Sequence, residues 1–154
     1  MHALERTQLI PAPRDELFTF FEDPRNLGEI TPPEMGFTIL KMDSLPIRPG
    51  FRIKYRIKVL GMPVTWVSKI TEYEPGVRFA DVQVKGPYAY WRHEHTFEDA
   101  EGGTVMRDRV QYRLPFGILG NAVNRLLVAR QLRYIFDYRA RIIGERFAGE
   151  AVKA

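Results

Sequence analysis

The chain has 154 residues, a formal net charge of +4 and a sequence pI of about 9.5. Its 45% hydrophobic and 27% charged residues are typical of a globular protein with one core. It contains no cysteine, which excludes disulfides, thiolate catalysis and cysteine-ligated zinc. No signal-peptide core opens the sequence and no apolar run is long enough for a membrane span. We therefore expect a soluble, cytoplasmic protein with a single domain over residues 1–154, its last few residues forming a tail.

The first third of the chain predicts one strand, two short helices and a second strand. Apolar and polar residues alternate over 3–10, which indicates a strand that Pro11 and Pro13 end. Asp15 and Glu16 then open an amphipathic helix, because acidic residues favour a helix N-terminus. A second short helix is expected through Leu27, ending at Pro32–Pro33. A strand follows at about 36–43.

The rest of the chain predicts a meander of strands and then one long helix. Turns rich in glycine and proline separate five strands, expected at 51–59, 64–73, 77–84, 88–97 and 104–114. Because the turns are short, consecutive strands should pair antiparallel. No proline occurs from 117 to 148, where apolar residues recur at helical spacing, with a break near Gly120 as one option. The predicted fold is α+β, with a curved seven-stranded antiparallel sheet around the C-terminal helix and a cavity between them.

Several local strings resemble the START-like or Bet v 1-like superfamily, also called the polyketide cyclase/dehydrase (SRPBCC) group. They are Ile10-Pro11-Ala12-Pro13, Phe21-Glu22-Asp23-Pro24, Trp91-Arg92-His93, His95-Thr96-Phe97-Glu98, Asp108-Arg109-Val110 and Leu114-Pro115-Phe116-Gly117. The resemblance covers nearly the whole chain and implies a helix-grip fold that binds a small hydrophobic ligand. It is closest to a bacterial ligand-binding subgroup, some of whose members are fused to a nucleotide-sugar-epimerase-like oxidoreductase. That oxidoreductase class is therefore an expected partner.

Alternation along the strands predicts which side chains face the cavity. Tyr55 lies on the apolar face of its strand, and Trp66 and Ser68 share the better core face of the next. Periodicity does not decide the strand at 77–84, where the resemblance favours Phe79 and its face. The whole set expected to line the cavity is Tyr55, Trp66, Ser68, Phe79, Asp81, Gln83, Trp91, His93, His95, Asp108, Tyr112, Leu127 and Phe136.

The strand at 88–97 carries the most informative pattern. His93 and His95 alternate with polar residues on the face that also holds Trp91 and Phe97, so both imidazoles should point inward. Asp108 is the only charge on the apolar face of the last strand. Hairpin register places it opposite His93 or His95, depending on a two-residue shift in the turn.

Three interpretations of this His–Asp group remain open. It can be a satisfied polar network that holds the sheet or orients a ligand. It can perform acid–base catalysis with His93, His95 and Asp108, as cyclases of this superfamily do. It can bind a metal through His-x-His and Asp108. We expect no metal, because the only other histidine is His2, and no cofactor, because there is no glycine-rich phosphate loop.

Basic residues suggest a rival class of function. Two groups would share the outer face of the sheet, Arg52, Lys54, Arg56 and Lys58 in one strand and Arg107, Arg109 and Arg113 in another. Such a surface can bind nucleic acid or an anionic membrane, but nearby glutamates dilute it. We therefore expect neither nucleic acid nor membrane insertion as a partner. On the long helix, Arg130 or Arg139 would hold a ligand carboxylate if it turned toward the cavity, although solvent exposure is the simpler expectation.

The sequence thus predicts the binding of a small hydrophobic or amphipathic ligand, such as a lipid, polyketide or aromatic metabolite. The alternative is a cyclase or dehydratase that uses a His–Asp pair in the same cavity. The oligomeric state is left open.

Overall fold

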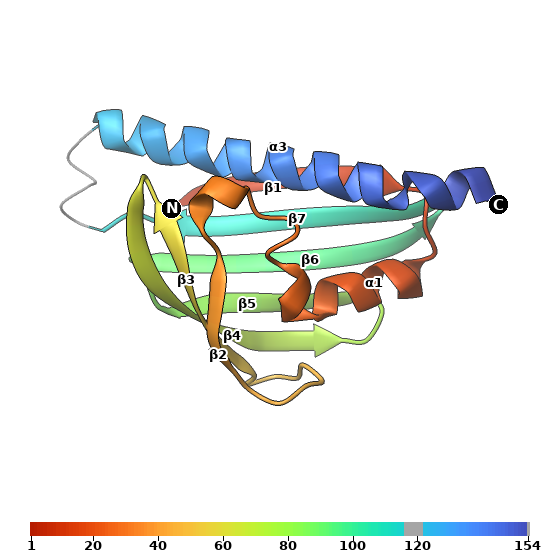
Figure 1. Cartoon of the computed structure of the whole chain (residues 1–154), viewed down its shortest axis with the longest axis horizontal. Coiled ribbons are helices and arrows are strands. Elements are labelled where there is room, and N and C mark those ends of the chain that lie inside the picture. Colours follow the sequence, from red (N-terminus) through yellow and green to blue (C-terminus); the bar gives the residue numbers. More distant parts are fainter. Residues whose placement is uncertain (116–121, 154) are drawn as a thin grey trace.

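A curved antiparallel sheet and one long helix define the architecture (Figure 1). The computed structural model describes residues 1–115 and 122–153. The seven strands lie in the order β1-β7-β6-β5-β4-β3-β2, so only β1 is displaced from a simple meander. Their bounds are β1 His2–Ile10, β2 Thr38–Met42, β3 Arg52–Val59, β4 Met62–Glu74, β5 Arg78–Lys85, β6 Tyr90–Ala100 and β7 Gly103–Arg113. This confirms the predicted helix-grip fold.

Alternating burial shows that the strands obey the predicted two-faced pattern. In β3 the basic residues Arg52, Lys54 and Arg56 are exposed, whereas Ile53 and Tyr55 turn toward the core. In β6 the buried positions are the odd-numbered residues from 91 to 97. One face of the sheet therefore contacts solvent and the other holds both the core and the cavity.

The short helices between β1 and β2 differ in part from the prediction. Helix α1 (Arg14–Glu22) begins after Pro13, with Asp15 and Glu16 in its first turn, as expected. The predicted second helix through Leu27 is instead two separate 3-10 turns, η1 (Pro24–Asn26) and η2 (Pro33–Met35). The second begins at the proline that was expected to end a helix, because the fixed φ of proline suits a first helical position.

Helix α3 (Ala122–Lys153) lies against the sheet and runs along its length (Figure 1). Its buried residues recur at spacings of four and seven residues, typical of one helix face: Val128, Leu132, Phe136, Ile143 and Phe147. The predicted start near 117 and the predicted break near Gly120 lie outside the described residues. No helix among the residues the structure describes is long and apolar enough to cross a membrane.

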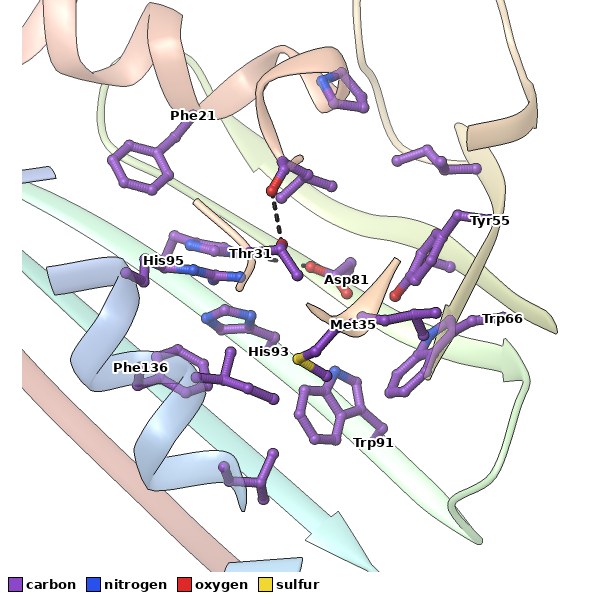
Figure 2. Close-up of a pocket in the computed structure, with 18 of the residues that line it drawn as sticks. Phe21, Thr31, Met35, Tyr55, Trp66, Asp81, Trp91, His93, His95 and Phe136 are labelled. Atoms are coloured by element: carbon purple, nitrogen blue, oxygen red, sulfur yellow. Dashed lines mark hydrogen bonds and ion pairs between the residues drawn. The ribbon is translucent and has the colours of Figure 1, made fainter. Parts of the chain in front are cut away.

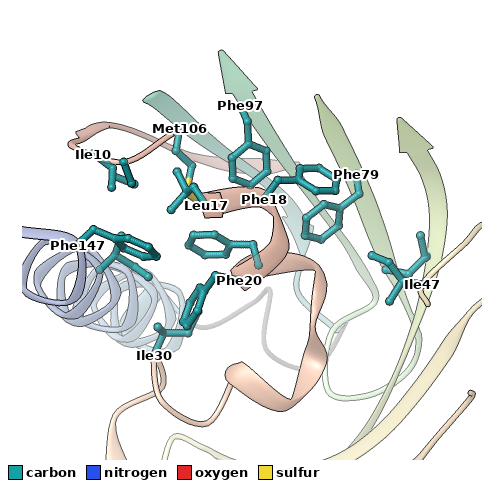
Figure 3. Packing of buried hydrophobic residues seen from close by; sticks show 14 of the residues in the cluster. Ile10, Leu17, Phe18, Phe20, Ile30, Ile47, Phe79, Phe97, Met106 and Phe147 are labelled. Atoms are coloured by element: carbon teal, nitrogen blue, oxygen red, sulfur yellow. The ribbon is translucent and has the colours of Figure 1, made fainter. Parts of the chain in front are cut away.

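Two clusters of buried residues fill different ends of the space between sheet and helix. The phenylalanine cluster packs α1 against the sheet and the C-terminal half of α3 (Figure 3); it comprises Leu17, Phe18, Phe20, Phe21, Phe79, Phe97, Ile143, Phe147 and their neighbours. The tryptophan cluster lies beneath the N-terminal half of α3; it comprises Trp66, Tyr88, Trp91, Val110, Tyr112, Leu114, Val128, Leu132 and Phe136. A cavity occupies the space between the two clusters.

Candidate ligand-binding site

The main cavity has a volume of about 140 Å³ and lies between the inner face of the sheet and the helices (Figure 2). Four strands supply its floor, with Tyr55 from β3, Trp66 from β4, Phe79 from β5 and Trp91 from β6. Met35 of η2 and Phe136 of α3 contribute to other walls. Side chains from elements far apart in sequence thus converge on one space, which is typical of a small-molecule site.

Aromatic rings make up much of the cavity wall. The ring of Tyr55 stacks on Trp66 with centroids 5.9 Å apart, and Trp66 meets Trp91 edge-on at 5.2 Å. Tyr88 packs against both tryptophans. The indole N–H of Trp66 is buried and has no hydrogen-bond partner among the described residues. The wall therefore offers ring faces for stacking and one unused donor.

A buried polar cluster lies beside these indoles on the same inner face of the sheet (Figure 2). Three neighbouring strands supply it: Asp81 from β5, His93 and His95 from β6, and Asp108 from β7. Register places Asp81 opposite His93 and Asp108 opposite His95. The sequence prediction of a His–Asp group on the inner face is confirmed in its geometry, and the register falls on the His95 alternative.

Asp108 is the centre of this cluster. Nε2 of His93 and Oδ1 of Asp108 form a hydrogen bond of 2.8 Å. His93, diagonal to Asp108 in the sheet, therefore contacts it more closely than His95, which lies directly opposite. Nδ1 of His95 lies 3.1 Å from the same oxygen, but at an angle that gives no hydrogen bond. The other ring nitrogen of His95 is 3.8 Å from Asp81 Oδ2. The two imidazole centroids are 3.8 Å apart, and His95 stacks on Phe79.

The pKa values of the two histidines shift in opposite directions. Burial and the neighbouring His95 lower the pKa of His93. Burial also opposes a charge on His95, but Asp108 and Asp81 outweigh it and raise the pKa of His95. Burial would raise the pKa of Asp108, but the two imidazoles hold it well below its usual range. The cluster thus combines a carboxylate with one imidazole whose neutral form is favoured and one whose protonated form is favoured.

Three of these side chains are close enough to share a metal ion. One ligand atom each from Asp81, His93 and His95 lies within 4.8 Å of the others. Two imidazoles and a carboxylate suit several divalent transition metals. The carboxylate in this group is that of Asp81, whereas the sequence suggested Asp108 as the third ligand. Since His93 already hydrogen-bonds Asp108 through Nε2, Asp108 would act as a partner of the ligand rather than a ligand.

Arg139 of α3 is a cavity-lining residue whose orientation the sequence left open. It lines the main cavity and also a second one of about 140 Å³, which lies beside β1 and includes Gln8 and Asp108 in its wall. Phe21 and Phe136 likewise border both spaces. Arg139 therefore turns inward, unlike Arg130, which is exposed. Several arginines lie on this helix, so only its rotation against the sheet distinguishes them.

Nine of the thirteen predicted lining residues lie on the main cavity, namely Tyr55, Trp66, Ser68, Phe79, Asp81, Trp91, His93, His95 and Phe136. The other four do not line it. Asp108 borders the second cavity behind the histidines. The Gln83 amide instead exchanges two hydrogen bonds with the backbone of Tyr88, at 2.8 and 3.0 Å. Tyr112 is buried in the tryptophan cluster, and Leu127 is 42% exposed because Val128 and Leu132 occupy the inner face of α3.

On β5, β6 and β7, several basic residues of the outer face have acidic partners. Arg107 pairs with Glu98 at 2.8 Å and Arg109 with Glu5 at 3.3 Å. Farther along, Arg78 and Arg92 share Glu72 and Glu94. These ion pairs divide the positive charge on β5, β6 and β7 into small areas, which weakens the argument for a nucleic-acid surface there. No ion pair between described residues involves the exposed basic side chains of β3, Arg52, Lys54, Arg56 and Lys58.

Comparison with known proteins assigns the family. Residues 10–135 match the family described as polyketide cyclase / dehydrase and lipid transport, so the chain belongs to that family. No curated protein sequence matches the chain. The description of this family names both an enzyme activity and lipid transport, so membership alone does not decide between catalysis and ligand binding.

Solved structures support the fold. A START superfamily protein from Mycobacterium smegmatis aligns over 97% of this chain and 99% of its own, with 12% identity and a TM-score of 0.71. The di-domain aromatase/cyclase StfQ of the steffimycin biosynthetic pathway aligns over 99% of this chain and 52% of its own, with 16% identity and a TM-score of 0.73. A nucleoside-diphosphate sugar epimerase from Corynebacterium glutamicum is 25% identical, with a TM-score of 0.66, over 92% of this chain and 28% of that protein. An oxidoreductase as a partner of this chain stays a prediction, as does a cytoplasmic location.

Proposed function

We propose that this protein binds a compact hydrophobic or amphipathic molecule in the main cavity. The observation that carries the proposal is the division of the cavity wall into a ring-lined region around Trp66 and Trp91 and a polar cluster around His93 and His95. An amphipathic ligand would stack its apolar part on the indoles and direct a polar group to the cluster. Family membership supports a ligand-binding or cyclase role at this level.

The cavity volume favours a small ligand over a long-chain lipid. A dry cavity of about 150 Å³ in another protein holds one benzene molecule, and this cavity measures about 140 Å³. One aromatic or alicyclic ring with a short polar substituent therefore fits without rearrangement. Among the ligand classes considered from the sequence, an aromatic metabolite or a small polyketide unit fits better than an extended lipid.

Native mass spectrometry of freshly purified protein, beside a denatured control, tests this proposal. We expect an additional defined mass that disappears on denaturation and corresponds to a small organic molecule. A double variant that carries both Trp66→Ala and Trp91→Ala should lose that mass. The control Leu127→Ala, on the exposed side of α3, should keep it. Retention of the same ligand by the tryptophan variant would overturn the proposal.

A second function, acid–base catalysis, is favoured by the opposite pKa shifts of the two cavity-lining histidines. His93, whose lowered pKa favours the neutral ring, is suited to accept a proton next to a carbonyl, and His95, whose raised pKa favours the protonated ring, to donate one to a leaving hydroxyl. The net reaction is loss of water from a β-hydroxy ketone. Transfer of the proton that His93 has accepted to His95 then restores both side chains to their starting states. Asp108, which contacts both rings, would orient them during this transfer.

Dehydration of an aryl β-hydroxy ketone, followed by absorbance of the conjugated product, distinguishes enzyme from carrier. A catalytic role predicts that His93→Gln and His95→Gln each lower the turnover rate by at least about 100-fold while the ketone still binds. His2→Gln is the matched control, because His2 stacks on Tyr112 outside the cavity. No turnover by the wild-type protein above the buffer rate would contradict catalysis of this reaction and leave the carrier function.

A further inference from the structure

Arg139 has no anionic partner among the described residues, unlike the next two arginines along α3. Arg141 pairs with Glu145 and Arg146 with Glu29, both at the surface. Arg139 instead points between the two cavities, with its guanidinium carbon 5.0 Å from the centre of the Phe136 ring. Its Nε is buried and makes no hydrogen bond to any described residue. A cationic group with five donors is thus presented to the cavity with its donors available.

The nearby carboxylates do not meet this need. Asp81 and Asp108 act on Arg139 only at longer range, and no described carboxylate lies within ion-pairing distance of it. Both aspartates are already engaged with the histidines. Burial accordingly lowers the pKa of Arg139, although the two carboxylates oppose this effect. A buried charge without a partner is costly in free energy, so an anion from outside the chain would relieve that cost.

We infer that Arg139 is the anion subsite of the cavity and that the ligand is a compact aromatic monocarboxylate. This inference rests on the proposed binding function and specifies its ligand class. The carboxylate would accept two parallel N–H bonds from the guanidinium while the ring packs against the aromatic wall. A ring of this kind also matches the volume of the cavity.

The charge on the cavity wall favours a monoanion over a phosphate. Among the described lining residues, Arg139 is the only arginine or lysine, whereas Glu22 and Asp81 add negative charge to the same wall. A dianion would be repelled by these carboxylates and would find only one permanent cation. A carboxylate needs only that one partner and leaves the His–Asp contacts intact.

Cinnamate and cinnamyl alcohol test the inference as a matched pair of probes, since they share ring and chain and differ in the carboxylate. Tryptophan fluorescence reports binding, because the two tryptophans of the chain both line the cavity. The titrations use wild type, Arg139→Met, Arg139→Lys and the control Arg130→Met at about pH 7.5, where the acid is ionised. Arg130 lies on the same helix but is exposed.

For the wild-type protein and Arg130→Met we expect cinnamate to bind at least about 10-fold more tightly than the alcohol. Arg139→Met should abolish this preference by weakening cinnamate binding more than alcohol binding, and Arg139→Lys should retain part of it. Equal affinities of the wild-type protein for both probes would overturn the anion subsite and leave the binding function standing, with cavity water as the partner of the guanidinium. Binding of neither probe would overturn both, and this result needs no variant to fold.

Discussion

The phenylalanine cluster and the tryptophan cluster lie under the same helix, and the main cavity lies at their shared border. Helix α1 covers the sheet at the first cluster and inserts Leu17, Phe18 and Phe21 between sheet and α3. At the tryptophan cluster no comparable helix intervenes within residues 1–115 and 122–153, and Met35 is the one residue of η2 on the cavity wall. The comparison shows that one short helix determines where the fold is solid core and where it can hold a ligand.

The largest effect should follow from damage to the solid end. Phe18 is 3% exposed and meets Phe79 and Phe97 edge-on, so Phe18→Ala should lower the free energy of unfolding by about 3–5 kcal/mol. Ile57→Ala, at a partly exposed position on the cavity wall, should cost less than about 2 kcal/mol. Guanidinium chloride denaturation measures both. Equal losses would contradict the division into a filled and a hollow end.

The polar cluster should matter next. Asp108→Asn keeps the shape of the side chain but removes the charge that both histidines face, at an expected cost of about 2–3 kcal/mol. Asp99→Asn is the matched control, because the Asp99 carboxylate is exposed and should matter by less than about 0.5 kcal/mol. The same denaturation experiment compares them. If Asp108→Asn unfolds like the control, the cluster contributes nothing to stability.

The pH dependence of stability is a smaller and more specific effect. Burial opposes a charge on His95, but Asp108 and Asp81 raise its pKa in the folded protein. The folded protein therefore binds this proton more tightly than the unfolded chain does. Its stabilisation is complete below about pH 6.5, the unfolded value, and is lost as the pH rises through the folded pKa.

Denaturation midpoints between about pH 7.5 and pH 9, above the range in which the lowered pKa of His93 has the opposite effect, should consequently decline for the wild-type protein and for His2→Gln. His95→Gln should flatten that decline, because the titrating group is gone. A decline of unchanged size in His95→Gln would assign the effect to another group and remove this support for the charge pattern of the cluster.

The smallest effect is expected on the outer face of the sheet. Lys54 and Arg56 are exposed in β3, and the side chain of Tyr55 between them turns inward. The double substitution Lys54→Gln and Arg56→Gln should change stability by no more than about 0.5 kcal/mol and leave cinnamyl alcohol binding unchanged. A large loss of probe affinity would mean that the two faces of the sheet are not independent.

Strand alternation was sufficient to predict most of the site. Alternation predicted that His93 and His95 point inward, because side chains two residues apart share a face and Trp91 and Phe97 on the same strand are buried. Asp108 followed from the apolar face of β7 in the same way. Alternation could not decide β5, where Phe79 and Ala80 are both buried on opposite faces. There the prediction depended on resemblance rather than on the residues themselves.

The contribution of α3 was much harder to predict. Leu126, Leu127 and Val128 are consecutive and apolar, and only the last is buried. A helix rotates its residues by about 100° per step, so a small error in its orientation exchanges one neighbour for the next. The same ambiguity left open whether Arg130 or Arg139 turns toward the cavity. The orientation of this helix against the sheet is set by tertiary packing, which no local pattern in the chain encodes.

The central claim, that the space between the two clusters is a ligand site, is tested most directly by NMR. The chain has two tryptophans, so its spectrum should contain two indole N–H signals, from Trp66 and Trp91. Titration with cinnamyl alcohol should shift both, with the larger change at Trp66, whose buried N–H lacks a partner among the described residues. Shifts confined to backbone amides on the outer face of the sheet, with both indole signals unmoved, would contradict the claim.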